Sequence, residues 1–338
     1  MNSKNAPRIA MRIEARQWPL RAPFLISGYR FTAVDVLTVT LDDRRAVGRG
    51  EAAGVYYHHE TPSSMARQLD ASRDVIEAGA NRFEVQQMLP AGGARNALDC
   101  ALWELESRRS GKPVHELAGI GKSQPLRTTF TIGAGDPAHM AVEARGWKDA
   151  TAIKLKLTGS EEDAERVRAV RAARPDVWLM VDANQGFTPD TLHALMPALV
   201  AARVQLIEQP FPIDRDAWMG TLQSPIRVAA DESFQDRHDF DRIAGRFDMV
   251  NIKLDKCGGL TEALAIADEA RRRGLGLMTG NMGGTSLAMA PALVVAQLCD
   301  VADLDGPVQL ADDLSPSVRY ENGNVCCPDD VWGASLSA

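Results

Sequence analysis

The sequence predicts a (β/α)8-type barrel preceded by a smaller α+β domain. Residues 8 to about 55 are typical of strands and residues 60 to 120 of helices, a combination that forms an α+β unit. From about residue 125, eight short strand-like runs alternate with helix-like segments over roughly 180 residues, as in a barrel. A chain of 338 residues with 45% hydrophobic content is long enough for one barrel and an attached domain.

The first domain is expected to contain three strands, at residues 9–18, 33–41 and 47–52. The third strand follows the turn-like Asp42-Asp43-Arg44. Residues 94–105 predict an amphipathic helix, because leucine and alanine recur on one face at positions 98, 101, 102 and 105.

The barrel is expected to use strands at 127–132, 152–157, 178–182, 204–208, 226–231, 249–253, 275–280 and 302–305. Helices are predicted between them, such as residues 160–173, opened by Ser160 as N-cap, and residues 261–273, ended by Gly274. We therefore expect a capping domain over 1–124, a barrel over 125–308, and a C-terminal segment over 309–338 that packs back on the capping domain.

Lysines alternate with apolar residues in the stretch Ile153-Lys154-Leu155-Lys156-Leu157. In a strand, both lysines project from one face and the apolar side chains from the other. An isolated pattern of this kind is usually a surface strand. A strand between helices is instead usually buried on both faces, and two buried lysines there require anionic neighbours.

Every expected barrel strand ends in polar or charged residues, where the active site of such a barrel is built. Asp182, Glu208 and Asp231 are 26 and 23 residues apart, and Lys253 follows 22 residues later, so each interval fits one β/α unit. The full set is Thr131, Lys154, Lys156, Asp182, Glu208, Asp231, Lys253, Asn281, Asp303 and Asp305.

Three carboxylates on consecutive strands indicate a cation between them, since they would otherwise repel one another. Each carboxylate taken alone is more often a solvated loop residue or a helix cap. Ligation by oxygen alone favours a hard ion, which predicts Mg²⁺ and leaves Mn²⁺ open. The six histidines fall in expected loops or helices, so a zinc site is not predicted.

Lys156 and Lys253 are expected to face each other, because strands two and six lie on roughly opposite sides of an eight-stranded ring. A neighbouring metal ion and a second lysine disfavour the ammonium form and bring a lysine pKa toward about 7 to 8. A metal-bound carboxylate has its α-proton acidified. One lysine on each face predicts racemisation or epimerisation α to a carboxylate, by 1,1-proton transfer through a metal-stabilised enediolate.

The composition argues against several other classes of protein. A net charge of -7 and a pI near 5.5 argue against nucleic-acid and anionic-membrane binding. No run approaches the roughly 20 apolar residues of a membrane span, residues 1–20 lack a secretory h-region, and five cysteines without metal-type spacing indicate free thiols. We expect a cytoplasmic protein that acts on a small molecule, with homo-oligomerisation left open.

These motifs resemble the enolase superfamily, its muconate-lactonizing subgroup, and within it the dipeptide epimerases, of which the L-Ala-D/L-Glu epimerases are typical. The pairing of a lysine base with Mg²⁺ is a general property of that superfamily. The resemblance covers nearly the whole chain and is carried by residues 96–103, the Lys154–Lys156 strand, Val181-Asp182-Ala183-Asn184, Glu208-Gln209-Pro210, Ala230-Asp231-Glu232-Ser233, residues 250–259 and Asp303-Leu304-Asp305-Gly306-Pro307.

The resemblance implies a role for each of these residues. Asp182, Glu208 and Asp231 would bind Mg²⁺, Lys156 would act on the (R) epimer and Lys253 on the (S) epimer. Lys154 would neutralise the substrate carboxylate, with Thr131 and Asn281 beside it in the substrate site. Lys256 is a rival for the role of Lys253, although it falls past the expected strand end.

Asp303 and Asp305 distinguish dipeptide epimerases from racemases of N-acylated amino acids, because only a dipeptide presents a free α-ammonium group to clamp. One of the two aspartates could instead cap a loop. Two loops, at about 21–30 and 51–60, would close over the barrel, and Arg30 in the first could pair with a glutamate side chain or simply be solvated. The second carries Tyr56-Tyr57-His58-His59, which either helps exclude water or is ordinary surface.

One stretch departs from many relatives, which have an acidic residue after a Ser-Met pair following strand seven. This chain instead has Gly280-Asn281-Met282-Gly283-Gly284, so the shape of its substrate pocket cannot be copied from theirs. We predict a Mg²⁺-dependent dipeptide epimerase with a role in murein peptide breakdown. The alternatives are an N-acylamino acid racemase, an o-succinylbenzoate synthase or a cycloisomerase on the same scaffold, a metal-free aldolase that forms a Schiff base at Lys253, and a non-catalytic binding protein.

Overall fold

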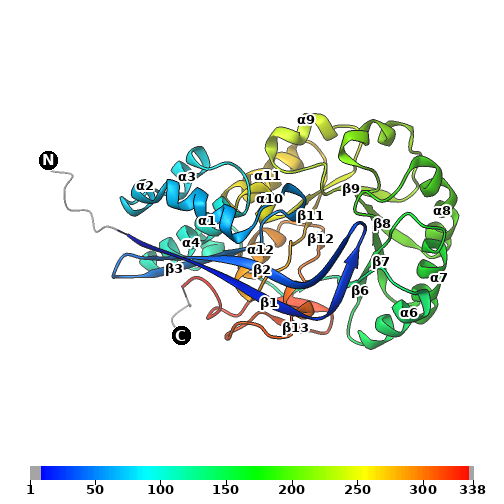
Figure 1. The fold of residues 1–338 in the computed structure, drawn as a ribbon, viewed down its shortest axis with the longest axis horizontal. Coiled ribbons are helices and arrows are strands. Elements are labelled where there is room, and N and C mark those ends of the chain that lie inside the picture. The colour runs from blue at the N-terminus through cyan, green and yellow to red at the C-terminus, as the bar shows by residue number, and fades with distance from the viewer. Residues whose placement is uncertain (1–8, 335–338) are drawn as a thin grey trace.

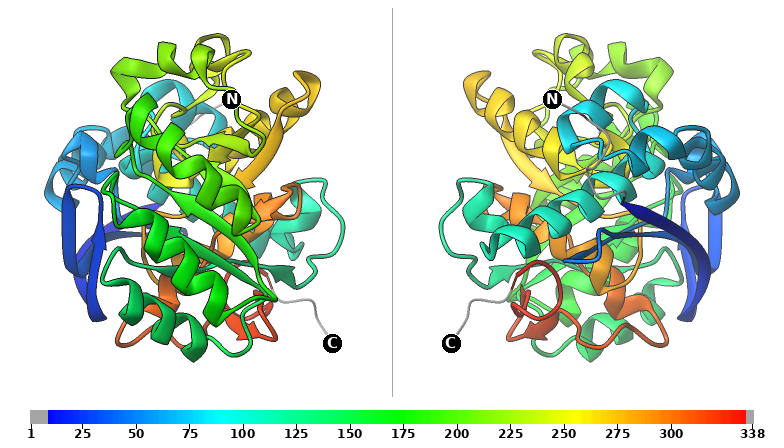
Figure 2. Two further views of the ribbon diagram at one scale, coloured as in Figure 1. Left: turned by 90° about the vertical axis from the view of Figure 1, so that its right-hand side faces the viewer. Right: turned by 90° about the vertical axis from the view of Figure 1, so that its left-hand side faces the viewer.

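The computed structural model describes residues 9–334 and has two parts (Figure 1). An antiparallel sheet with helices at its side forms the cap, and a ring of parallel strands surrounded by helices forms the barrel. Figure 2 shows that the cap helices lie against the side of the barrel built by α10 (Leu254–Cys257) and α11 (Leu260–Arg272). The predicted fold class, a (β/α)8-type barrel with an N-terminal α+β domain, is confirmed, and the barrel has the modified (β/α)7β form.

The cap sheet has the order β1-β2-β3, formed by β1 (Ala10–Ile26), β2 (Tyr29–Asp42) and β3 (Val47–Ala52). Its helices are α1 (Pro62–Ala71), α2 (Arg73–Glu77), α3 (Arg82–Met88) and α4 (Gly93–Ser110). Strand β3 packs directly on α4, where a Cβ at Gly50 would lie 2.1 Å from the Ala97 carbonyl oxygen. Glycine at position 50 therefore lets the strand and helix backbones touch.

Residues 21–30, expected to be a loop, form the end of a long β-hairpin. Strand β1 continues to Ile26, the chain turns at Ser27 and Gly28, and β2 begins at Tyr29. Gly28 has a φ of 77°, which suits glycine in a tight turn. The hairpin extends across the mouth of the barrel (Figure 1), so this lid is a paired structure.

The barrel strands run parallel in the order β5 to β12, and a bridge between Thr128 and Ala302 joins the first edge to the last. The strands are β5 (Phe130–Ile132), β6 (Ala152–Lys156), β7 (Trp178–Asp182), β8 (Val204–Glu208), β9 (Arg227–Ala230), β10 (Met249–Ile252), β11 (Gly276–Thr279) and β12 (Val301–Ala302). The helical segments between them are α6 (Pro137–Gly146), α7 (Asp163–Ala173), α8 (Pro189–Ala201), η2 (Ile213–Thr221), η3 (Arg237–Asp239), α9 (Phe240–Ile243), α10 (Leu254–Cys257), α11 (Leu260–Arg272) and α12 (Ser286–Ala296).

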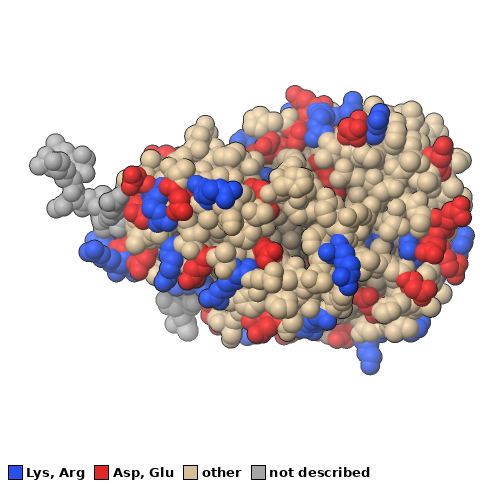
Figure 3. All heavy atoms as spheres, in the orientation of Figure 1, with Lys and Arg blue, Asp and Glu red and all other residues tan. Residues whose placement is uncertain are grey.

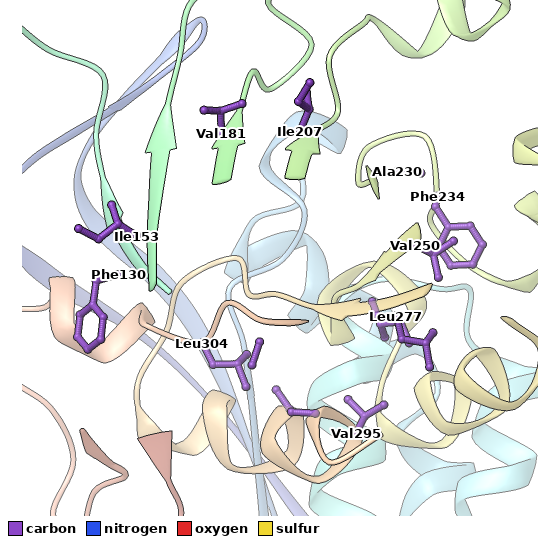
Figure 4. Close-up of a cluster of buried hydrophobic side chains, with 14 of the residues drawn as sticks. Phe130, Ile153, Val181, Ile207, Ala230, Phe234, Val250, Leu277, Val295 and Leu304 are labelled. Atoms are coloured by element: carbon purple, nitrogen blue, oxygen red, sulfur yellow. The ribbon is translucent and has the colours of Figure 1, made fainter. Parts of the chain in front are cut away.

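Side chains alternate between the inside and the outside of the ring along each strand. The outward set, which includes Ile153, Val181 and Val250, packs in the large core under the helices (Figure 4). The inward set forms a separate apolar cluster of Met180, Leu206, Ala229, Met249 and Met278. The next inward position of several strands, toward the C-terminal end, is polar. Apolar packing therefore fills one end of the barrel and leaves the other end for chemistry.

The starts of two helices and the end of the last barrel strand differ from the sequence-based predictions. Ser160 does not cap α7, which starts at Asp163; the Asp163 carboxylate accepts hydrogen bonds from the amides of Thr158 and Gly159 and so closes the preceding turn. Helix α11 starts at Leu260, with Gly259 before it. Strand β12 ends at Ala302, so Asp303 and Asp305 lie in the loop after the strand.

The C-terminal segment contacts both parts of the molecule. Strands β13 (Arg319–Glu321) and β14 (Asn324–Cys326) pair with β4 (Leu126–Arg127), and farther on the Arg49 guanidinium of the cap donates to the Val331 carbonyl. The domain boundaries at residues 124 and 308 stay a prediction. The packing of the whole C-terminal segment on the cap also stays a prediction, because residues 335–338 lie outside the described residues. Within residues 9–334, no helix is long and apolar enough to cross a membrane. The five cysteines are free thiols, as their spacing predicts.

Three buried carboxyl groups join the cap to the barrel. Glu51 accepts hydrogen bonds from the Thr285 amide (2.7 Å) and hydroxyl, Asp255 accepts one from the Gly54 amide (2.7 Å), and Asp99 accepts one from the Thr261 amide (2.9 Å). Burial raises the pKa of Glu51 to about 7 and those of Asp99 and Asp255 to about 6, although these hydrogen bonds oppose the shift.

We expect Glu51 to make the protein less stable as the pH rises from about 5 to 8. A carboxyl pKa raised by folding means that the folded state holds the proton more tightly, so the stabilisation is complete below the unfolded pKa and is lost as the pH rises through 7. The free energy of unfolding of the wild type minus that of Glu51→Gln should be about 2 kcal/mol smaller at pH 8 than at pH 5. Urea denaturation with EDTA measures it; a difference independent of pH would contradict the assignment.

Candidate active site

A cavity of about 280 Å³ lies between the cap hairpin and the ends of the barrel strands, and it opens in the hollow near the centre of the face in Figure 3. The cap contributes mainly apolar walls, including Phe24, Ile26 and Phe31. The barrel contributes seven of the predicted site residues: Thr131, Lys154, Lys156, Lys253, Asn281, Asp303 and Asp305. The sequence-based assignment thus converges on one cavity.

The three predicted metal ligands come together behind this cavity. Asp182 and Glu208 end the neighbouring strands β7 and β8 and are paired in register, and Asp231 directly follows β9. One carboxylate oxygen from each lies within 4.8 Å of the other two, and all three side chains are buried. Three buried carboxylates at this separation match the donor set of a hard divalent cation.

The three lysines each contact these carboxylates. Lys154 Nζ lies 3.0 Å from Asp182 Oδ2 and 2.8 Å from Glu208 Oε2. Lys156 Nζ lies 2.7 Å from Asp182 Oδ2, and Lys253 Nζ lies 2.7 Å from Asp231 Oδ2. Lys156 ends β6 and Lys253 directly follows β10, so the two lysines flank the carboxylates from either side.

The lowered pKa expected for Lys253 concerns the metal-bound site and stays a prediction. Burial lowers the pKa of Lys253, but the negative charges of Asp231 and Glu208 raise it by more, so the net pKa lies above the usual value. A bound cation and a second lysine would oppose this attraction by repelling the ammonium form. Burial and the charge of Asp182 raise the pKa of Glu208 to about 7, whereas the lysines hold that of Asp182 near 2 against the effect of burial.

Four neighbours that were not predicted as site residues orient these groups. Asn251 donates to Glu208 Oε1 (2.8 Å), and Asn184 accepts from Lys156 Nζ (3.0 Å). Gln209 Oε1 accepts from the Asp231 amide (3.0 Å), and the buried Glu232 accepts from Asn184 (3.2 Å). Asn251 could have been found because it precedes Lys253 by two residues and so shares its inward face.

Asp303 and Asp305 both line the cavity but have different surroundings. Asp303 Oδ2 pairs with Lys154 Nζ at 2.7 Å, and its Oδ1 accepts from the Thr129 hydroxyl at 2.5 Å. Asp305 Oδ2 accepts from the Thr131 amide at 2.7 Å, and burial raises the pKa of Asp305 to about 6. Asp303 therefore already forms an ion pair with a lysine, whereas Asp305 has no cationic partner within hydrogen-bonding distance among the described residues.

The lid residues close the cavity with aromatic rings. Tyr56 packs edge-on against Tyr29 and Phe31 of the hairpin, with ring centroids 4.7 and 5.4 Å apart. Gln235 of the barrel donates to the Tyr57 hydroxyl at 3.1 Å and so ties the second lid segment to the loop that follows Asp231. Arg30 is exposed on the hairpin and does not line the cavity, so its pairing with a substrate side chain stays a prediction.

The comparison with protein families identifies the superfamily of this chain. The mandelate racemase/muconate lactonizing enzyme N-terminal domain family matches residues 8–119, and the enolase C-terminal domain-like family matches residues 136–334. The chain belongs to the enolase superfamily. The two families together account for most of the cap and the barrel, and the carboxylate triad lies inside the second.

Similar members of the superfamily include enzymes and solved structures. The L-Ala-D/L-Glu epimerase of Escherichia coli is 39% identical, with 93% of this chain and 98% of the relative covered. An N-acetyl-D-glutamate racemase of Pseudoalteromonas is 33% identical, with 89% and 96% covered.

Two solved structures share the whole architecture. An enolase family member from Agrobacterium tumefaciens, described with homology to dipeptide epimerases and with sodium and L-Ala-L-Glu bound, superposes with a TM-score of 0.93 at 39% identity, covering 96% of this chain and 100% of that one. A dipeptide epimerase from Methylococcus capsulatus complexed with Mg and L-Arg-D-Lys gives 0.88 at 32% identity, covering 94% and 96%.

Proposed function

We propose that this enzyme is a Mg²⁺-dependent dipeptide epimerase, an isomerase that inverts the carbon α to the C-terminal carboxylate. The observation that carries the proposal is the placement of Lys156 and Lys253 on either side of a buried carboxylate triad, beside a cavity that is also lined by Asp303 and Asp305. Two bases on opposite sides of one carbon are what inversion by proton transfer requires.

Asp182, Glu208 and Asp231 are the residues proposed to hold the metal. Their fit rests on the donor chemistry and on Glu208 Oε2, a buried oxygen that faces Lys154 but has no hydrogen bond of acceptable geometry. A divalent cation at these carboxylates would supply positive charge that stabilises the substrate carboxylate as negative charge builds on it and disfavours the ammonium form of the nearby lysines.

The lysines carry out the proton transfers. Neutral Lys253 Nζ removes the α-proton of the (S) epimer from one face, and protonated Lys156 Nζ delivers a proton to the other face, which yields the (R) epimer. The reverse reaction exchanges the two roles. Lys154, fixed by Asp303 at 2.7 Å, binds the substrate carboxylate with its positive charge.

A dipeptide is the proposed substrate because a free α-ammonium group would give Asp305 the cationic partner that it lacks among residues 9–334. Three of the four relatives named above are described by a dipeptide that they epimerise or bind, and L-Ala-D/L-Glu is the expected pair here. We further propose that the enzyme works in the cytoplasm in murein peptide breakdown, where such a pair would arise.

The first test is α-proton exchange in D₂O, followed by NMR, on a library of L-Ala-X dipeptides. We expect exchange and epimer formation with Mg²⁺, and loss of both when EDTA removes the metal and restoration when Mg²⁺ is returned. No exchange on any dipeptide with metal bound would overturn the proposal. Exchange only on N-acylated amino acids would favour the alternative represented by the N-acetyl-D-glutamate racemase.

The same library tests Arg30. If the hairpin brings its guanidinium to a substrate glutamate, Arg30→Met should lower kcat/KM for L-Ala-L-Glu by about tenfold, in line with the cost of a partly exposed ion pair. The value for L-Ala-L-Leu should not change and serves as the control. An equal effect on both dipeptides would mean that Arg30 acts only through the hairpin.

A further inference from the structure

A fourth lysine touches the proposed metal ligands but does not reach the cavity. Lys256 lies on the four-residue helix α10, three residues after Lys253, and its side chain is fully buried. Its Nζ donates to Asp231 twice, to the backbone carbonyl and to carboxylate Oδ1, both at 2.6 Å. The other oxygen of the same carboxylate, Oδ2, belongs to Lys253 at 2.7 Å.

We propose that Lys256 is a positioning residue that fixes the Asp231 carboxylate and thereby the affinity of the triad for its metal. A donor that holds both the main chain and one carboxylate oxygen of Asp231 restricts the rotation of that side chain. Asp231 then presents Oδ2 in a constant direction, whatever Lys253 does. Lys256 does not line the cavity, which separates it from the lysines that face substrate.

Lys256 is itself held from the side of the cap. The Arg95 guanidinium of α4 donates to the carbonyls of Cys257 (2.6 Å) and Gly258 (3.2 Å). A Cβ at position 258 would lie 2.2 Å from Arg95 Nε. Glycine at position 258 therefore lets the end of α10 pack against the arginine. The cap therefore positions α10, and α10 positions Asp231 through Lys256.

The arrangement also explains how Lys253 can leave Asp231 during the reaction. When Lys253 turns toward substrate, Lys256 stays hydrogen-bonded to Asp231, so the buried carboxylate keeps a donor. A donor that fixes the orientation of a metal-binding carboxylate raises the affinity for the metal. Loss of such a donor usually lowers metal affinity by about 10- to 100-fold.

If Lys256 positions Asp231, Lys256→Met should change the affinity for Mg²⁺ in the opposite direction from that expected if Lys256 acts only through its charge. Removing a positive charge next to the triad should tighten Mg²⁺ binding by Coulomb's law alone. Removing the donor that orients Asp231 should weaken it, and we expect the Kd for Mg²⁺, measured by calorimetry without substrate, to rise at least tenfold. A Kd that falls or stays within twofold of the wild type would overturn the proposal.

The matched control is Arg166→Met, which removes another buried cation, one that pairs with Asp163 on α7 away from the triad. It should lower the thermal midpoint and leave the Kd for Mg²⁺ unchanged. If Lys256→Met does not fold, Lys256→Ala with ethylammonium in the buffer replaces it. The amine should restore the Kd, and a Kd that the amine does not improve would count against positioning.

This inference rests on the metal role of Asp231 in the proposed function, but the two can fail separately. Wild-type enzyme that binds Mg²⁺ and epimerises no dipeptide would remove the proposed reaction and leave the role of Lys256 testable by the same calorimetry. A second readout is the rate of α-proton exchange of each pure epimer. Lys256→Met should slow exchange of the (S) epimer, whose proton Lys253 removes, more than exchange of the (R) epimer.

Discussion

Lys156→Ala and Lys253→Ala should each lower the rate of epimerisation by about 10³-fold, the usual contribution of a general base. Each variant should nevertheless keep one half of the reaction. Without Lys156, the (S) epimer should still exchange its α-proton with D₂O through Lys253, and without Lys253 the (R) epimer should exchange through Lys156. NMR of each pure epimer with Mg²⁺ measures both rates, and normal epimerisation by both variants would disprove the two-base assignment.

The structure explains why these variants should remain folded. Asp182 keeps Lys154 at 3.0 Å when Lys156 is removed, and Asp231 keeps Lys256 at 2.6 Å when Lys253 is removed. A buried carboxylate left without a cation would be strongly destabilising, but each of these two has a second one. The control is the Kd for Mg²⁺, which should stay within a few-fold of the wild type in both variants. A large loss of metal affinity would mean that the activity change has another origin.

The sequence was sufficient for the features that repeat. Period-two alternation places Lys154 and Lys156 on one face of β6, and the parallel register of β6, β7 and β8 puts Asp182 and Glu208 beside Lys156 on the same inward surface. The regular interval between strand ends then brings Asp231 and Lys253 to the same site. Both inferences use sequence spacings that the fold repeats: two residues within a strand, and one β/α unit between the ends of neighbouring strands.

Features that depend on contacts between distant segments could not be predicted in this way. The extension of the lid as a paired hairpin depends on cross-strand pairing between β1 and β2, and residues 21–30 alone lack a strong strand pattern. The pKa of Lys253 depends on how close Asp231 and Glu208 come to it. The different partners of Asp303 and Asp305 depend on Lys154 and Thr131, about 150 and 174 residues away.

Asp305→Asn should weaken the binding of a dipeptide by about 10²-fold and leave the binding of its N-acetylated form unchanged. Asp305 has no cationic partner within residues 9–334, so its carboxylate is available to the substrate ammonium, and an ion pair with a buried, hydrogen-bonded charge is worth about 2 to 5 kcal/mol. L-Ala-L-Glu and N-acetyl-L-Ala-L-Glu differ at that ammonium alone. Calorimetry at pH 8, above the pKa of about 6 for Asp305, compares them with the carboxylate ionised.

Asp303→Asn provides the contrast, because Asp303 is paired with Lys154 and not free. Its loss should leave Lys154 held by Asp182 and Glu208 alone and drawn toward them. We expect Lys154 to bind the carboxylate that both ligands share, so affinity for the free and the acetylated dipeptide should fall together. Selective loss in Asp305→Asn beside common loss in Asp303→Asn would assign the ammonium to Asp305 and the positioning of Lys154 to Asp303. If Asp303→Asn is the selective variant, the two aspartates have the reverse roles, and Lys154 does not depend on its 2.7 Å partner.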